Sequence, residues 1–163
     1  MKYAIFILHL GFAALVLSAG QSSARNVCMG SASTWDDCYR SVTDADGNKY
    51  VGTFKKGKFE GEGKYSEANG NVYTGTWKNG VFHGEGVRSF ADGSKYTGAY
   101  RDGLKHGAGT YVSPTGATYH GDCKNGKYAG RGVLTKANGA TYTGVWAFGK
   151  MQGQGTYASP KGH

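Results

Sequence analysis

The chain has 163 residues, of which 29 are glycine and 2 are proline, and its formal net charge at pH 7 is +8. This glycine content with so little proline excludes a collagen-like chain, while 39% hydrophobic and 13% aromatic residues exclude a disordered one. The length predicts one domain, and the positive charge predicts contact with anionic surfaces such as phospholipid headgroups or acidic glycans.

The first 24 residues have the pattern of a secretory signal peptide. Lys2 gives a short basic start, an apolar run follows over residues 4–17, and small residues come after it. The run is too short to persist as a membrane-spanning helix. Cleavage after Ala24 would place small residues at the −3 and −1 positions, which signal peptidase recognises. Cleavage after Gly20 is the second choice. A retained anchor or a buried helix is the alternative. We therefore expect an exported protein, periplasmic or secreted.

Residues 25–49 are predicted to form an N-terminal arm and a capping half-repeat. Cys28 and Cys38 lie ten residues apart in this segment. Export permits a disulfide between them, which would hold the arm over the first strand of the fold. The alternative is a pair of reduced, partly buried thiols.

Residues 50–163 contain five copies of a 23-residue repeat, the last one residue shorter. Counted from its first tyrosine, each copy has glycine at positions 3, 8, 12, 14 and 21, and four copies have an aromatic residue at position 5. The copies are residues 50–72, 73–95, 96–118, 119–141 and 142–163. This pattern resembles the MORN (membrane occupation and recognition nexus) repeat. Cys123 departs from it, because it occupies position 5 of the fourth copy.

Each copy is predicted to form two antiparallel strands. Positions 1–5 alternate as tyrosine, polar, glycine, polar and aromatic, and this period of two is typical of a strand; positions 12–17 form a second one. In the turn between the third and fourth copies, Thr115 disfavours the positive φ of a type I′ turn, whereas Pro114 fits a type I turn. We therefore expect a three-residue loop in which Gly116 is left-handed.

That turn sets the pairing register, in which position 16 lies opposite the next tyrosine. Tyr65 then pairs with Tyr73, Gly61 with Trp77, and in the half-repeat Cys38 with Phe54. The predicted fold is all-β: an elongated, single-layer, twisted antiparallel sheet solenoid of stacked hairpins, with ten to eleven strands. The resemblance to MORN repeats implies the same architecture.

One face of this sheet is predicted to be aromatic and the other polar. The glycine at position 12 would let the ring at position 5 of the next copy lie flat over the backbone. This aromatic face serves mainly packing; a peptide or glycan ligand is the alternative. Arg88 is expected to stack on the ring opposite it, Tyr96. The face comprises Tyr50, Phe54, Tyr73, Trp77, Tyr96, Tyr100, Tyr119, Tyr142 and Trp146.

Positions 7–11 connect the two strands within a copy. A tight turn pairing position 5 with position 9 would place odd-numbered positions of the second strand on the aromatic face. The turn between copies requires even-numbered positions there. We therefore expect a wider loop or a bulge here, with the position-10 side chains over the rim of the sheet. Those side chains are Phe59, Phe82, Tyr128 and Met151.

Cations recur at positions 6 and 9, on one rim of the predicted sheet. They are Lys55, Lys78, Arg101 and Lys124, joined by Lys58, Lys127 and Lys150. About 10 Å apart, they would repel one another weakly and act together on an anionic surface. The alternative is a solvated rim that prevents edge-to-edge aggregation.

No catalytic, metal or cofactor site is predicted. His83 and His106 recur about 10 Å apart, too far for shared metal ligation. The Gly-x-Gly pairs lie inside strands without a following helix, so they do not form a phosphate loop. Cys123 is interpreted as a small buried hydrophobe, with a reactive thiol as the alternative.

The sequence thus favours an exported, non-catalytic MORN-repeat module that binds an anionic envelope surface or a protein partner, because the resemblance implies membrane association and scaffolding. Export disfavours nucleic acid. The alternative is a protein–protein scaffold, indifferent to lipid, that uses the aromatic face or the C-terminal edge strand. That strand, around residues 154–158, carries no charge, and we expect it to pair with a second copy or a partner.

Overall fold

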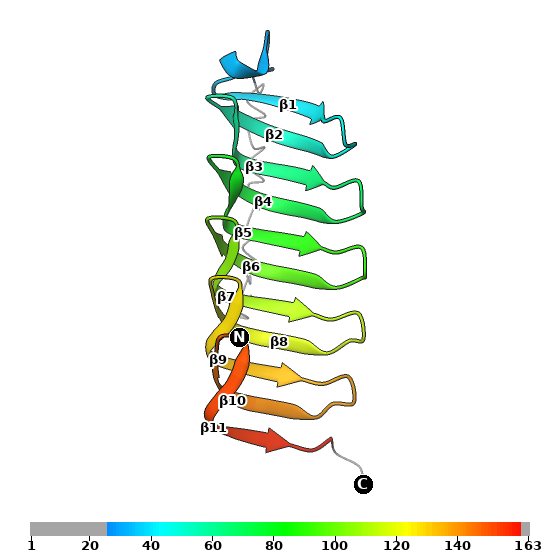
Figure 1. The fold of residues 1–163 in the computed structure, drawn as a ribbon, viewed down its shortest axis with the longest axis vertical. Coiled ribbons are helices and arrows are strands. Elements are labelled where there is room, and N and C mark those ends of the chain that lie inside the picture. Colours follow the sequence, from blue (N-terminus) through cyan, green and yellow to red (C-terminus); the bar gives the residue numbers. More distant parts are fainter. Residues whose placement is uncertain (1–25, 161–163) are drawn as a thin grey trace, which may run out of the picture.

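The computed structural model describes residues 26–160, which form one antiparallel sheet of 11 strands in sequence order (Figure 1). The predicted all-β, single-layer fold is confirmed; the predicted signal peptide lies outside the described residues. Within residues 26–160 no helix is long and apolar enough to cross a membrane. The elements are η1 (Ala32–Thr34), β1 (Cys38–Thr43), β2 (Lys49–Lys55), β3 (Lys58–Ser66), β4 (Val72–Lys78), β5 (Val81–Ser89), β6 (Lys95–Arg101), β7 (Leu104–Val112), β8 (Thr118–Lys124), β9 (Lys127–Thr135), β10 (Thr141–Ala147) and β11 (Lys150–Ala158).

The turn between repeats has the predicted form. At the β3–β4 turn the Gly70 amide donates to the Glu67 carbonyl over 3.0 Å, and Gly70 has a φ of 94°. This is a type I turn followed by a left-handed glycine. The predicted register follows, with Tyr65 opposite Tyr73. The predicted pairing of Cys38 with Phe54 is confirmed as well.

The turn within a repeat is tighter than predicted. Lys56 and Gly57 both have positive φ, 48° and 72°, and their neighbours Lys55 and Lys58 pair directly. This two-residue loop has the left-handed geometry that a type I′ turn requires. The expected wider loop is therefore wrong. A two-residue loop pairs position 5 with position 10, so even-numbered positions of the second strand stay on the aromatic face. The turn within a repeat and the turn between repeats can therefore both be tight.

The predicted bulge is present, between the pairs Gly52–Gly63 and Thr53–Glu60. Gly61 lies in it with a φ of 63°. The glycine at position 12 is thus needed for its left-handed backbone, and not to accommodate the facing ring as the sequence suggested. The sheet bends here, so the hairpin tips turn out of the plane of the other strand halves (Figure 1).

The core is a column of rings along the aromatic face. The Phe59 ring stacks on the Tyr50 ring with centroids 3.7 Å apart, and Tyr128 stacks on Tyr119 at 3.6 Å. The position-10 rings therefore lie inside the column and not over the rim, because position 10 pairs with position 5. Only Met151 of that set is exposed, at the last strand.

The two ends of the sheet differ. Cys28 and Cys38 form the predicted disulfide, and the Cys28 amide donates to the Tyr39 carbonyl, so the arm pairs with the outer edge of β1 at Tyr39. Trp35 follows η1 and packs edge-on against Phe54, at 4.8 Å between centroids. At the other end, all nine residues of β11 are exposed.

Candidate binding surfaces

The seven predicted rim cations lie along one edge of the sheet, beside the type I′ turns, and all are exposed. Two have acidic partners: Lys55 is 3.7 Å from Asp37, and Arg101 is 3.8 Å from Asp102. These pairs contribute little because both partners face solvent. We call this surface the cationic edge.

Exposed apolar side chains lie on the same edge, and sequence reasoning missed them. Val81, Leu104 and Phe148 are 42%, 49% and 83% exposed. Phe148 stands at the first turn position with a φ of 52°, where two other repeats have asparagine. Bulky residues rarely adopt this conformation. One feature of the sequence could have revealed this apolar surface: Phe148 is apolar, whereas position 7 of the other copies is polar.

The nine residues predicted for the aromatic face are packing residues. Eight are buried, and Tyr142 is half-buried. The indole N–H of Trp77 donates to the Gly63 carbonyl over 3.3 Å, which fixes the ring across the neighbouring strand. Burial raises the pKa of Tyr100 to about 12, and its hydroxyl has no hydrogen-bond partner among residues 26–160.

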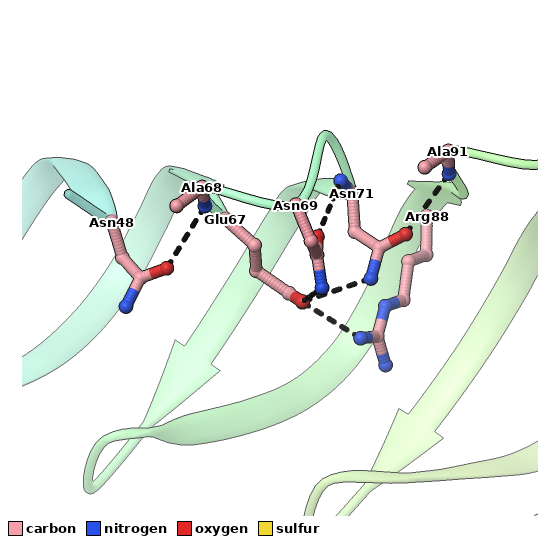
Figure 2. Close-up of polar contacts among 7 residues, drawn as sticks. All are labelled: Asn48, Glu67, Ala68, Asn69, Asn71, Arg88 and Ala91. Atoms are coloured by element: carbon pink, nitrogen blue, oxygen red, sulfur yellow. Dashed lines mark hydrogen bonds and ion pairs between the residues drawn. The ribbon is translucent and has the colours of Figure 1, made fainter. Parts of the chain in front are cut away.

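Arg88 lies opposite Tyr96 as predicted, but it does not stack on that ring. Its guanidinium carbon lies over Phe82 at 5.4 Å and Phe90 at 5.0 Å. Its Nη2 also donates to Glu67 Oε1 over 2.7 Å (Figure 2).

Glu67 belongs to a polar ladder that joins successive inter-repeat turns (Figure 2). Asn48 accepts from the Ala68 amide, and Asn71 accepts from the Ala91 amide, each over 3.0 Å. Burial alone would raise the pKa of Glu67, but hydrogen bonds from the neighbouring asparagines and the Arg88 charge lower it overall. This ladder ties neighbouring turns together and keeps Glu67 ionised.

Cys123 is buried in the aromatic column as predicted, and burial raises the pKa of its thiol. The structure thus places it as a small core residue. Next to it, at position 10 of the third repeat, Lys105 takes the place of a ring. Its Nζ lies 4.7 Å from the Tyr96 ring centroid, a contact that sequence reasoning missed.

The model of the MORN repeat family matches residues 50–72, 73–95, 96–118, 119–141 and 142–163. The chain belongs to the MORN repeat family. The MORN repeats supply β2–β11 almost entirely and form a repeat-based binding or scaffold module.

No curated protein matches the chain. Among solved structures, the MORN sheet is similar to the SAS-4 (dCPAP) TCP domain of Drosophila melanogaster, solved in complex with a proline-rich motif of Ana2 (dSTIL). The identity is 15% and the TM-score 0.37, over 65% of this chain and 64% of that one. This chain thus spans less than two thirds of that structure, and the likeness carries no conclusion about function.

Proposed function

We propose that this MORN-repeat protein is an exported, non-catalytic module that docks through its cationic edge on an anionic membrane or envelope surface. The observation that supports it is the joint presence, on one edge, of seven exposed cations and the exposed side chains of Val81, Leu104 and Phe148. A surface that combines cations with apolar side chains suits the interface of an anionic bilayer.

The energies favour collective binding. Each lysine or arginine near an anionic leaflet contributes about 1 kcal/mol. Cations on successive repeats are two strand spacings apart, about 10 Å, close to one Debye length at physiological salt. They therefore repel one another weakly while all of them face the same surface.

Export is the second part of the proposal, with cleavage near Ala24. The Cys28–Cys38 disulfide supports it, because disulfides persist in oxidising compartments. The intact mass of the protein recovered from the exported fraction tests this directly. A chain starting at Arg25 is the expected result, and full-length protein retained in the cytoplasm would contradict it.

Co-sedimentation with vesicles tests the docking. The purified protein is mixed with anionic and neutral vesicles at low and high salt. We expect binding to anionic vesicles alone, abolished by salt. Serine in place of Lys55, Lys78, Arg101 and Lys124 should weaken binding at least 100-fold, on the order expected for four such contacts.

A matched control removes the same charge elsewhere. It carries serine in place of Lys49, Lys64, Lys95 and Arg131, which are exposed and lie outside the cationic edge. This control should retain most of the binding. Equal losses of vesicle binding in both variants would show that net charge alone drives binding. If the wild-type protein bound neither anionic nor neutral vesicles, the proposed membrane function would be wrong.

A second candidate is a scaffold that associates through β11, with no role for lipid. Its nine residues are exposed and no strand of residues 26–160 pairs with its outer edge, whereas the arm pairs with β1 at Tyr39. Free strand edges add further strands. Two copies related by a two-fold axis would join through β11 and form a closed dimer. Light scattering over a wide concentration range should give twice the chain mass; a monomer throughout would refute it.

A further inference from the structure

Three residues that break the repeat pattern come together on the aromatic face. Arg88 replaces a large apolar residue at position 16, Lys105 replaces one at position 10, and Cys123 replaces a ring at position 5. Arg88 and Lys105 both face the Phe90 ring, at 5.0 and 5.8 Å from its centroid. Two cations thus approach one ring of the column.

Only one of the two cations is neutralised. Arg88 donates to Glu67, whereas the Lys105 ammonium makes no hydrogen bond or ion pair with residues 26–160. It contacts three rings, those of Phe90, Tyr96 and Tyr111. Cation–π contacts offset part of the desolvation, but an ammonium has three donors that these rings do not satisfy.

Lys105 opens into a groove of about 500 Å³. Phe90, Tyr111 and Tyr128 give its apolar walls, while Asp92 and Ser94 lie at one side. The exposed Lys127 stands at its mouth. A related groove two repeats earlier is lined by Phe59, Tyr65 and Trp77 and carries no charge. The cation is therefore particular to the third repeat.

We propose that this groove binds an extended peptide by placing an aspartate or glutamate carboxylate on Lys105 and a neighbouring apolar side chain against Phe90 and Tyr111. This inference goes beyond the docking of the cationic edge, which shares only Lys127 with the groove. It would let the module hold an acidic partner segment while its edge rests on a surface.

The charges select a carboxylate over a phosphate. Hydrogen bonds from Ser94 lower the pKa of Asp92, so that this carboxylate stays ionised beside the groove. The ionised Asp92 offsets the charge of the exposed Lys127, which leaves the single charge of Lys105 to be matched by one carboxylate. The groove is open to solvent, so an extended chain can lie across it with a side-chain carboxylate on Lys105.

Peptide titrations test the proposal. The first probe is a peptide of sequence Gly-Ser-Phe-Glu-Phe-Ser-Gly, blocked at both ends, and the second has glutamine for the glutamate. A third has a free C-terminal phenylalanine and no acidic side chain. Amide chemical-shift changes in the labelled protein give the Kd and the location. We expect the first peptide to bind at least tenfold more tightly than the others, with shifts at Phe90, Lys105 and Tyr111.

Variants assign the effect to the ammonium. Lys105→Met keeps the aliphatic packing and removes the charge, so it should weaken the first peptide about tenfold and leave the second unchanged, as expected for one charge-assisted contact. Lys105→Arg should retain binding. Lys64→Met, an equal loss of charge on the polar face, is the control and should have no effect.

Three results would overturn the proposal. Equal affinity for the glutamate and glutamine peptides would exclude carboxylate recognition. Tightest binding of the third peptide would assign the groove to a C-terminal carboxylate. Shifts confined to residues outside the groove, or no shift with any peptide at millimolar concentration, would show that the wild-type protein has no such site.

Discussion

The hydroxyl of Tyr50 lies so close to the backbone of Gly63 that a Cβ built on this glycine would stand 2.4 Å from the phenol oxygen. The same hydroxyl donates to the Thr53 carbonyl over 3.0 Å, which anchors the ring there. Tyr73 and Gly86 repeat this arrangement one repeat later, at 2.5 Å. The tyrosine ring at position 1 therefore packs directly against the backbone of the glycine at position 14.

Gly63→Ala is expected to lower the free energy of unfolding by about 1–3 kcal/mol, because the new methyl group overpacks a fixed ring. Urea unfolding followed by circular dichroism measures it. Lys64→Ala, on the adjacent exposed residue, is the control and should change stability by less than about 0.5 kcal/mol. Wild-type stability of Gly63→Ala would show that the ring moves aside.

Alkaline pH should unfold the sheet. Burial raises the pKa of Tyr100 and Tyr128 to about 12, and raises that of Tyr50 and Tyr73 further, whereas in the unfolded chain each is near 10. Above pH 10 the unfolded state therefore binds fewer protons, and stability falls as pH rises. Each such tyrosine contributes a slope of about 1.4 kcal/mol per pH unit.

Absorbance of tyrosinate, recorded with circular dichroism, checks this pH dependence. The buried tyrosines should ionise together with the loss of the sheet signal, and stability should be nearly constant between about pH 6 and pH 9, where neither these tyrosines nor the carboxylates titrate. Ionisation of these tyrosines below pH 11 in an intact sheet would contradict the expectation.

Removing the disulfide should loosen one end of the sheet. The double variant Cys28→Ala/Cys38→Ala is expected to lose about 2–3 kcal/mol, since the bridge closes a short loop. Hydrogen exchange should accelerate in β1 and leave β8 unchanged. Reduction of the wild-type protein should reproduce the loss; an unchanged melting temperature in both experiments would argue against a stabilising cap.

Phe148→Asn should stabilise the protein while weakening its surface binding. Asparagine tolerates positive φ, as at Asn79 and Asn125. Replacing the phenylalanine, which is strained in this left-handed conformation, should therefore raise the free energy of unfolding by about 0.5–1 kcal/mol. The variant also loses an 83% exposed apolar side chain from the cationic edge. Phe148→Leu is the control, because it keeps the apolar character without relieving the backbone. Unaltered vesicle binding by Phe148→Asn would exclude a role for this side chain.

The register between repeats was predictable because Pro114 and Thr115 exclude all but one turn type. The turn within a repeat was not, although Asn79-Gly80 and Asn125-Gly126 carry the residue pairs typical of a type I′ turn. Lys56 and Phe148 occupy the same turn position without such a preference, so the geometry comes from strand pairing and not from those residues.

The placement of the cationic edge also followed from sequence, since strand ends fix which residues reach a rim. The groove at Lys105 did not. Its lining residues Phe90, Lys105 and Tyr128 come from three different repeats, and only the stacking of strands brings them together. The visible signal was a lysine at position 10, where the other copies have a ring or methionine.

Because every repeat has the same register, the number of repeats sets the length of the sheet. Removal of residues 73–95 would join equivalent positions of neighbouring repeats, so every side chain would keep its face and the sheet would shorten by two strand spacings, about 10 Å. Removal of one residue more or fewer would move the remaining strands to the opposite face. The length of this protein can therefore change only in whole steps of one repeat, with its covered first strand and its open last strand unaltered.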